Sequence, residues 1–205
     1  AISYLFGKVY LGDIENPMVE NFSITHPILL HISDTPSVFF SEISRVINFV
    51  NPEIIVHTGD LVDNIKLQLY PGAIRYYERE VLSLLKILEN SSAKQIYISL
   101  GNHDCASFIH QNSGRIHVYD ELFEISPYDK KIAFSHFLTE IEAKEATYFL
   151  YGHDLSFPAH VTYNRFYLNG ITAIHLIDLK TGVVIKLDYP WGIDDARLNK
   201  RSIGI

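Results

Sequence analysis

Five short apolar runs in this chain each lead into side chains that can bind a metal ion. Short β-branched runs bounded by turn residues are typical of buried strands. The side chains that follow them are, in chain order, Asp34, Asp60, the group Asn102, His103 and Asp104, then His136 and His153. Neighbouring strands present their C-terminal ends along one edge of a sheet, so these residues can meet there. The sequence therefore predicts a metal-binding sheet edge.

The segments between the first three runs have helical spacing. Apolar residues recur at steps of three and four within 37–50 and within 73–89, which is typical of amphipathic helices. This alternation predicts βαβ units and a partly parallel sheet. From residue 115 the chain has short β-rich runs, a short helical piece at 139–146, and hairpin signals at 169–170 and 180–182. These features predict a mostly antiparallel second half.

One domain is expected. The chain has 205 residues, of which 47% are hydrophobic and 20% are charged, enough to bury one substantial core. We expect that core to span about 28–190. Residues 1–25 are interpreted as an N-terminal extension with a possible edge hairpin at 4–11, and residues 191–205 as a tail.

Charge and composition argue against several classes of partner. The net charge of −7, with no long basic run, gives no electrostatic footprint for nucleic acid. No apolar stretch reaches the roughly 18 residues that a membrane helix needs. The single cysteine, Cys105, excludes an internal disulfide and fits a reducing compartment. We therefore expect a soluble, cytoplasmic protein.

The motifs at the run ends resemble those of calcineurin-like metallophosphoesterases. That family has the successive blocks D-x-H, G-D-x-x-D, G-N-H-D or G-N-H-E, a histidine after a strand, and G-H-x-H. This chain has, in the same order, "ISDTPS", "HTGDLVDN", "LGNHDC", "FSHF" and "YGHDLSF". Each tetrapeptide alone is weak evidence, whereas the ordered set, spanning residues 28 to about 190, is specific.

The resemblance implies an α/β fold, a four-layer α/β/β/α sandwich with mixed sheets. It also implies divalent metal ions, drawn from Mn, Zn, Fe or Mg, in a two-metal site. Asp60 would bridge the two ions and Asp34 would bind the first of them. The ligands that complete the second ion would be Asn102, His136 and His153.

The resemblance further implies hydrolysis of a phosphate ester by a metal-bound hydroxide. His103 would steady the phosphate or protonate the leaving oxygen, and Asp104 would orient His103. A small-molecule phosphomonoester or phosphodiester is the expected substrate class. Segments 64–72 and 104–114 are expected to form the rim of the site.

Two positions depart from the family pattern. Pro36 stands where D-x-H has its histidine, and Leu155 stands where G-H-x-H has its second one. Both missing imidazoles belong to the metal that Asp34 should hold, and neither substitute can coordinate. Asp154 and His160 are candidate replacements by proximity. One or two ions per chain are therefore expected, the depleted site favouring a harder ion such as Mg or Mn.

Other readings of the same residues stay open. Asp34 and Asp60 could cap the helices that follow them, and Asp63 is more readily a cap or an outer partner than a ligand. His31 and His57 match no ligand position and are interpreted as sheet histidines.

The alternative function is a catalytically impaired binding or scaffold domain that keeps the fold, as the retromer scaffold subunit does in this family. Pro36 and Leu155 motivate this alternative. A nuclease is a third reading, disfavoured by the acidic charge.

Overall fold

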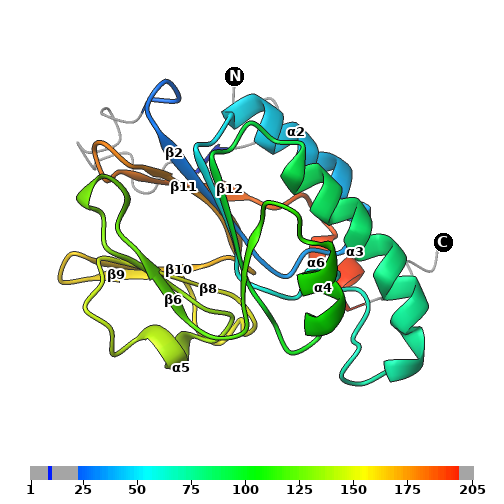
Figure 1. Ribbon diagram of the computed structural model, residues 1–205. Helices are drawn as coiled ribbons and strands as arrows, with labels where there is room; N and C mark the ends of the chain where they lie inside the picture. The colour runs from blue at the N-terminus through cyan, green and yellow to red at the C-terminus, as the bar shows by residue number, and fades with distance from the viewer. Residues whose placement is uncertain (1–8, 11–22, 199–205) are drawn as a thin grey trace.

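The strand and helix alternation of the first half of the chain forms a parallel sheet covered by helices. A computed structural model describes residues 9–10 and 23–198. Four strands pair in parallel, in the order β2 (Ile28–Ile32), β3 (Ile54–His57), β4 (Gln95–Ser99) and β5 (His117–Tyr119). Three helices, α2 (Phe40–Val50), α3 (Ile74–Glu89) and α4 (Ala106–Asn112), lie together on one face of this sheet (Figure 1). Helix α4 lies within the segment 104–114 that was expected to form a rim.

The C-terminal strands complete this sheet, which we call sheet A. Strand β11 (Ala173–Asp178) pairs antiparallel with β2, and β12 (Val184–Asp188) pairs antiparallel with β11. The short β1 (Val9–Tyr10) lies beyond β12. The hairpin predicted at 180–182 is confirmed, and the Asp178 carboxylate stabilises it by accepting bonds from the N–H groups of Lys180 and Thr181.

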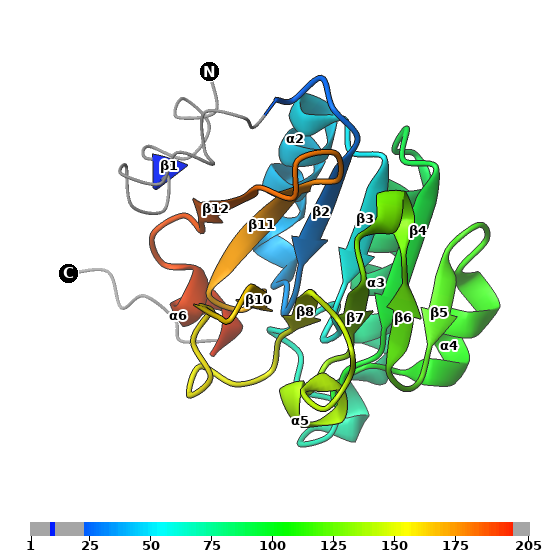
Figure 2. The same ribbon diagram turned by 90° about the vertical axis from the view of Figure 1, so that its left-hand side faces the viewer.

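A second sheet, sheet B, faces the first (Figure 2). Its strands, in spatial order, are β6 (Phe123–Ile125), β7 (Ile132–Phe134), β8 (Tyr148–Tyr151), β10 (Arg165–Asn169) and β9 (His160–Thr162). The pairs β7–β8 and β8–β10 are parallel, so the second half is mixed rather than mostly antiparallel. The hairpin predicted at 169–170 is wrong, because the chain there passes from sheet B to sheet A.

Alternating side chains of the strands divide the core into three parts. One face of sheet A packs on the helices through residues such as Leu30 and Ile55. The opposite face, carrying Leu29 and Val56, packs on sheet B. The short helix α5 (Leu138–Ile141) covers part of the outer face of sheet B. The expected four layers are present, although the outer helical layer is short.

The described C-terminal segment differs from the expected tail, because it contains a helix. The hairpin expected at 4–11 lies outside the described residues except for β1. Residues 193–197 form helix α6 (Ile193–Arg197), and Arg197 is only 4% exposed. Its guanidinium donates to the backbone oxygens of Asp34 and Ile171. The described part of the C-terminal segment therefore packs against the strand ends. Over residues 9–10 and 23–198, every helix is too short or too polar to cross a bilayer.

The packing between the sheets yields a stability prediction. Phe134 is fully buried there, with its ring centroid 5.7 Å from that of Tyr97. Phe134→Ala should lower the free energy of unfolding by about 3–5 kcal/mol, because it leaves a cavity in a packed layer. Phe157→Ala, at a side chain that is 45% exposed, is the control and should cost far less. Equal losses in urea unfolding would contradict this packing.

A buried histidine yields a prediction about pH. His175 stacks on His31 with both ring nitrogens unpaired among the described residues, and burial lowers its pKa to about 3. The unfolded chain takes up this proton near pH 6.5, so stability falls by about 1.4 kcal/mol per pH unit as pH drops from 6.5 toward 3. His175→Phe should remove that increment from the slope of unfolding free energy against pH. An unchanged slope would show that His175 titrates normally.

Candidate metal centre

The five predicted strand ends meet where the two sheets face each other. Asp34, Asp60 and Asn102 follow the parallel strands β2, β3 and β4 of sheet A. His136 and His153 follow the parallel strands β7 and β8 of sheet B. The pairing of β2 with β3 continues beyond the strands, because the N–H of Asp34 donates to Gly59. Both sheets therefore contribute side chains to one candidate site, whereas the strand pattern predicted the edge of a single sheet.

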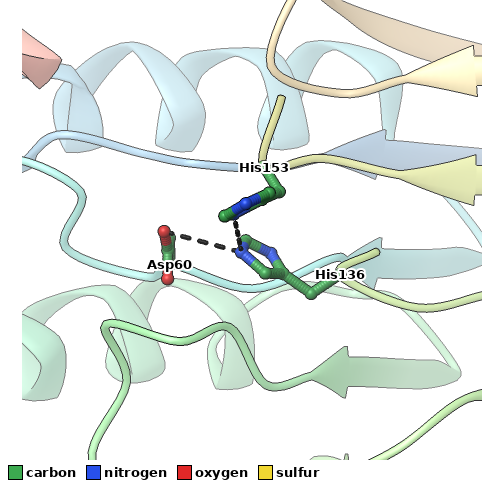
Figure 3. Close-up of side chains that lie close together, drawn as sticks. All are labelled: Asp60, His136 and His153. Carbon is green, nitrogen blue, oxygen red and sulfur yellow. Dashed lines mark hydrogen bonds and ion pairs between the residues drawn. The ribbon is translucent and has the colours of Figure 1, made fainter. Parts of the chain in front are cut away.

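The first group of candidate ligands consists of Asp60, His136 and His153. One donor atom from each lies within 4.8 Å of the other two. The Nε2 atom of His136 is 3.2 Å from Nδ1 of His153 and 3.6 Å from an oxygen of Asp60 (Figure 3). The amide oxygen of Asn102 lies 3.1 Å from the same Nε2 atom. Four side chains therefore converge on one small volume.

Hydrogen bonds outside this volume fix which atoms face inward. Nδ1 of His136 is 2.7 Å from the carbonyl oxygen of Thr58, which can only accept, so a neutral ring carries its proton on Nδ1 and presents the lone pair of Nε2. The amide N–H₂ of Asn102 donates to Gln68, which turns its oxygen toward Nε2 of His136. Lone pairs of oxygen and nitrogen thus face one another, which is unfavourable unless a cation lies between them. The donor set fits a divalent metal ion.

The second group consists of Asp34, Asp60 and Asp63, so Asp60 belongs to both groups. All three carboxylates are buried. Burial and the nearby charges of Asp34 and Asp104 raise the pKa of Asp60 well above its usual range. Burial and Asp34 also raise the pKa of Asp63 to about 7, against the opposing charge of Lys66. A cation placed among these carboxylates would relieve their repulsion.

Asp63 is the residue that sequence reasoning undervalued. Its N–H donates to the carbonyl oxygen of Thr35, which ties the loop after β3 to the loop after β2. That bond holds the Asp63 carboxylate beside those of Asp34 and Asp60. The second acid of the "GDLVD" motif was the available signal, but its spacing alone cannot distinguish a cap from an inward-facing carboxylate.

The residues expected to replace the missing histidines make other contacts. The Asp154 carboxylate accepts the N–H of Ser156, and His160 is exposed and stacked on Tyr167. Within residues 23–198, neither belongs to a group of candidate ligands. Leu155 is 58% exposed, and its side chain has no polar atom that could bind a metal ion. Of Asp63, Asp154 and His160, only Asp63 lies in a group of candidate ligands with Asp34.

The backbone at the site is held in uncommon conformations. Asp34, Asp60 and His153 have positive φ angles of 50°, 52° and 68°, a region that residues with a side chain rarely adopt. Such strain concentrates at functional sites, where surrounding contacts enforce it. Gly101 and Gly152 allow the close packing, because a Cβ at Gly101 would collide with the Asp60 carboxylate and one at Gly152 with that of Asp34.

His103 lies at the edge of the first group. Its backbone N–H donates to Asp60 at 2.9 Å, and its Nε2 atom is 3.3 Å from the amide nitrogen of Asn102. Partial burial and the charge of Lys66 lower the pKa of His103 to about 4. Its Nδ1 atom has no hydrogen-bond partner among the described residues. The ring is therefore neutral at neutral pH and lacks an internal acceptor.

Asp104 does not orient His103, contrary to expectation. Its carboxylate accepts hydrogen bonds of 2.7–2.9 Å from the hydroxyl of Tyr77 and from the N–H groups of Asp60, Leu61 and Gly101. Asp104 therefore clamps the loop after β3 to the loop after β4. The sequence could not predict this role of Asp104, because almost every residue has a backbone N–H group and residue type does not identify the donors.

Comparison with known proteins agrees with this geometry. A model of the calcineurin-like phosphoesterase family matches residues 28–187. No curated protein gives a significant match. A solved structure characterised as a novel archaeal phosphodiesterase has a TM-score of 0.56 at 16% identity, over 79% of this chain and 99% of that one.

Two other solved structures match at lower TM-scores. Vps29 from Entamoeba histolytica gives 0.45 at 14% identity, over 79% of this chain and 99% of its own. The nuclease MPE of Pseudomonas putida gives 0.41 at 17% identity, over 78% and 87%. The family match runs from the start of β2 almost to the end of β12 and includes every strand end of the site. The chain belongs to the calcineurin-like phosphoesterase family.

Proposed function

We propose that this chain is a metal-dependent hydrolase of small-molecule phosphomonoesters or phosphodiesters. The main support is the set of lone pairs that converge around Nε2 of His136. We assign one divalent ion to four ligands: Asp60, Asn102, His136 and His153. Asp34, together with Asp60, is assigned to a second and weaker position. The mixed nitrogen and oxygen set suits Mn, Zn or Fe, whereas the carboxylates favour Mg or Mn.

The residues around the assigned ion have separate roles in the proposed reaction. A bound divalent ion supplies Lewis-acid charge to the phosphoryl oxygens and favours ionisation of a water molecule. Thr58 and Gln68 hold His136 and Asn102 in their ligating orientations. As the oxygen of water bonds to phosphorus, that water would lose a proton to solvent and the bond to the leaving oxygen would break. His103 then gives its proton to that oxygen.

The low pKa of His103, about 4 in the free chain, is compatible with this role. The causes are partial burial and the nearby positive charge of Lys66. A bound phosphate ester brings negative charge beside the ring, which raises the pKa again. Protonation of His103 is therefore coupled to substrate binding.

A non-catalytic binding domain is the second candidate function. Pro36 and Leu155 favour it, because both remove imidazoles from one metal position. The phosphoesterase is preferred because the orienting bonds of His136 and Asn102 are in place. A binding surface has no evident need of such bonds.

Charge and cysteine content bear on the substrate class and on the cellular location. We propose one catalytic domain with its core at residues 28–190. The net charge of −7 disfavours nucleic acid as the substrate. Cys105 is a free thiol, which is consistent with a cytoplasmic location.

Metal-dependent turnover is the direct test. Purified protein should hydrolyse nitrophenyl phosphate mono- or diesters when supplied with Mn, Zn, Fe or Mg. Asp60→Asn should reduce turnover at least roughly 100-fold, because the amide weakens both metal positions. Asp120→Asn, at an exposed ion pair with His110, is the matched control and should keep full activity. Turnover that is absent with every metal, or equal in Asp60→Asn, would contradict the proposal.

The role of His103 is tested by varying the leaving group. His103→Ala should reduce hydrolysis of an alkyl or phenyl ester by roughly 100-fold or more. A nitrophenyl ester should be affected much less, because nitrophenolate leaves without protonation. His160→Ala is the control, since that ring is exposed and stacked on Tyr167. An equal loss for both esters would rule out proton donation by His103.

A further inference from the structure

Lys66 places a positive charge beside the metal position that lacks its histidines. Its ammonium pairs with the carboxylate of Asp63, which is 1% exposed. We propose that Lys66 replaces the second metal ion. The chain would bind one divalent ion, and the ammonium of Lys66 would hold a phosphate oxygen of the substrate. This inference rests on the proposed function.

The first argument is the charge of the buried carboxylates. Asp34, Asp60 and Asp63 lie within 4.8 Å of one another and are each at most 2% exposed. Buried carboxylates need compensating positive charge. One divalent ion at the His136 group, Lys66 and Arg197 would together balance four carboxylates, these three and the nearby Asp104. A second divalent ion would leave an excess of positive charge in the presence of Lys66.

The second argument is that a lysine lies beside the metal position of Asp34, where two imidazole ligands are missing. Pro36 and Leu155 supply no donor atom. The four-carbon stem of Lys66 instead brings an ammonium to Asp63 from three residues further along the chain. A compact ammonium is a common binder of phosphate oxygens, acting as a point charge.

The third argument is that the backbone of Lys66 is held by hydrogen bonds while its side chain is accessible to a substrate. Its carbonyl oxygen accepts the N–H groups of Leu69 and Tyr70 at 2.9 and 2.8 Å, which fixes its backbone. Its side chain is 25% exposed. Together with Asp63 and His153, it lines a cavity of about 290 Å³. A substrate phosphate in that cavity would lie between the metal ligand His153 and the ammonium.

Arg197 adds positive charge to the same cavity. It is 4% exposed and lines the cavity wall, and its Nη2 atom has no hydrogen-bond partner within the described part of the chain. Its Nε atom donates to the carbonyl oxygen of Asp34 at 2.8 Å. We interpret Arg197 as a positioning residue that holds the loop after β2. Lys66 is the cation that contacts the phosphate.

The test counts metal ions and measures phosphate affinity. Wild-type protein, dialysed against Mn²⁺ and analysed by elemental mass spectrometry, should hold one Mn per chain. Lys66→Met keeps the length of the side chain but removes its charge, so a second Mn should bind among the carboxylates. With a single equivalent of Mn²⁺, which fills only the His136 group, the affinity of Lys66→Met for inorganic phosphate, measured by calorimetry, should fall roughly 10- to 100-fold.

Two further variants separate charge from folding. Lys66→Arg keeps the charge and should retain one Mn and near wild-type phosphate affinity. Lys94→Met, at the exposed pair with Glu53, is the matched control and should behave as wild type.

Three results would overturn the inference. Two Mn ions in the wild type would do so, as would a Lys66→Met variant with unchanged Mn count and phosphate affinity. Suppose that Lys66→Met is unchanged while the wild-type chain binds one Mn and hydrolyses esters. This inference would then fail, and the proposed function would stand. A wild-type chain without Mn or turnover would overturn both.

Discussion

The hydrogen bond from Nδ1–H of His136 to the carbonyl oxygen of Thr58 is the contact on which the site depends. It joins the end of β7 in sheet B to the end of β3 in sheet A at 2.7 Å. In the neutral ring it also directs the lone pair of Nε2 toward Asn102 and Asp60. One interaction therefore joins the two sheets at the site and orients the imidazole.

The missing histidines and the extra charges of the site form one consistent pattern. In the proposed scheme, the loss of two imidazoles would weaken one metal position without weakening the other. Asp63 and Lys66 then bring a carboxylate and an ammonium to that position as a pair. A phosphoesterase with one ion and one lysine keeps two positive centres for a phosphoryl group. On this account, the departures at Pro36 and Leu155 alter the site without abolishing it.

The sequence predicted the parts of this site that depend on strand ends. Apolar runs locate the strands, and the ends of parallel neighbours meet, so residue order alone places Asp34 and Asp60 at a common edge, whereas His136 lies in the facing sheet. Roles that depend on backbone contacts could not be predicted. The partners of Asp104 are N–H groups, and the passage of the chain between sheets at 169–170 depends on packing far away in sequence. Arg197 was hidden for the same reason, because only the folded chain brings α6 to Asp34.

The position of bound metal is the most direct measure of this account. Crystals of protein purified without chelators and supplied with Mn²⁺ should give one anomalous peak per chain. We predict that this peak lies within about 2.3 Å of ligand atoms from four residues: Asp60, Asn102, His136 and His153. The Lys66 ammonium should lie by the carboxylates of Asp34 and Asp63. No peak at the His136 group, or a second peak among the carboxylates, would contradict the account.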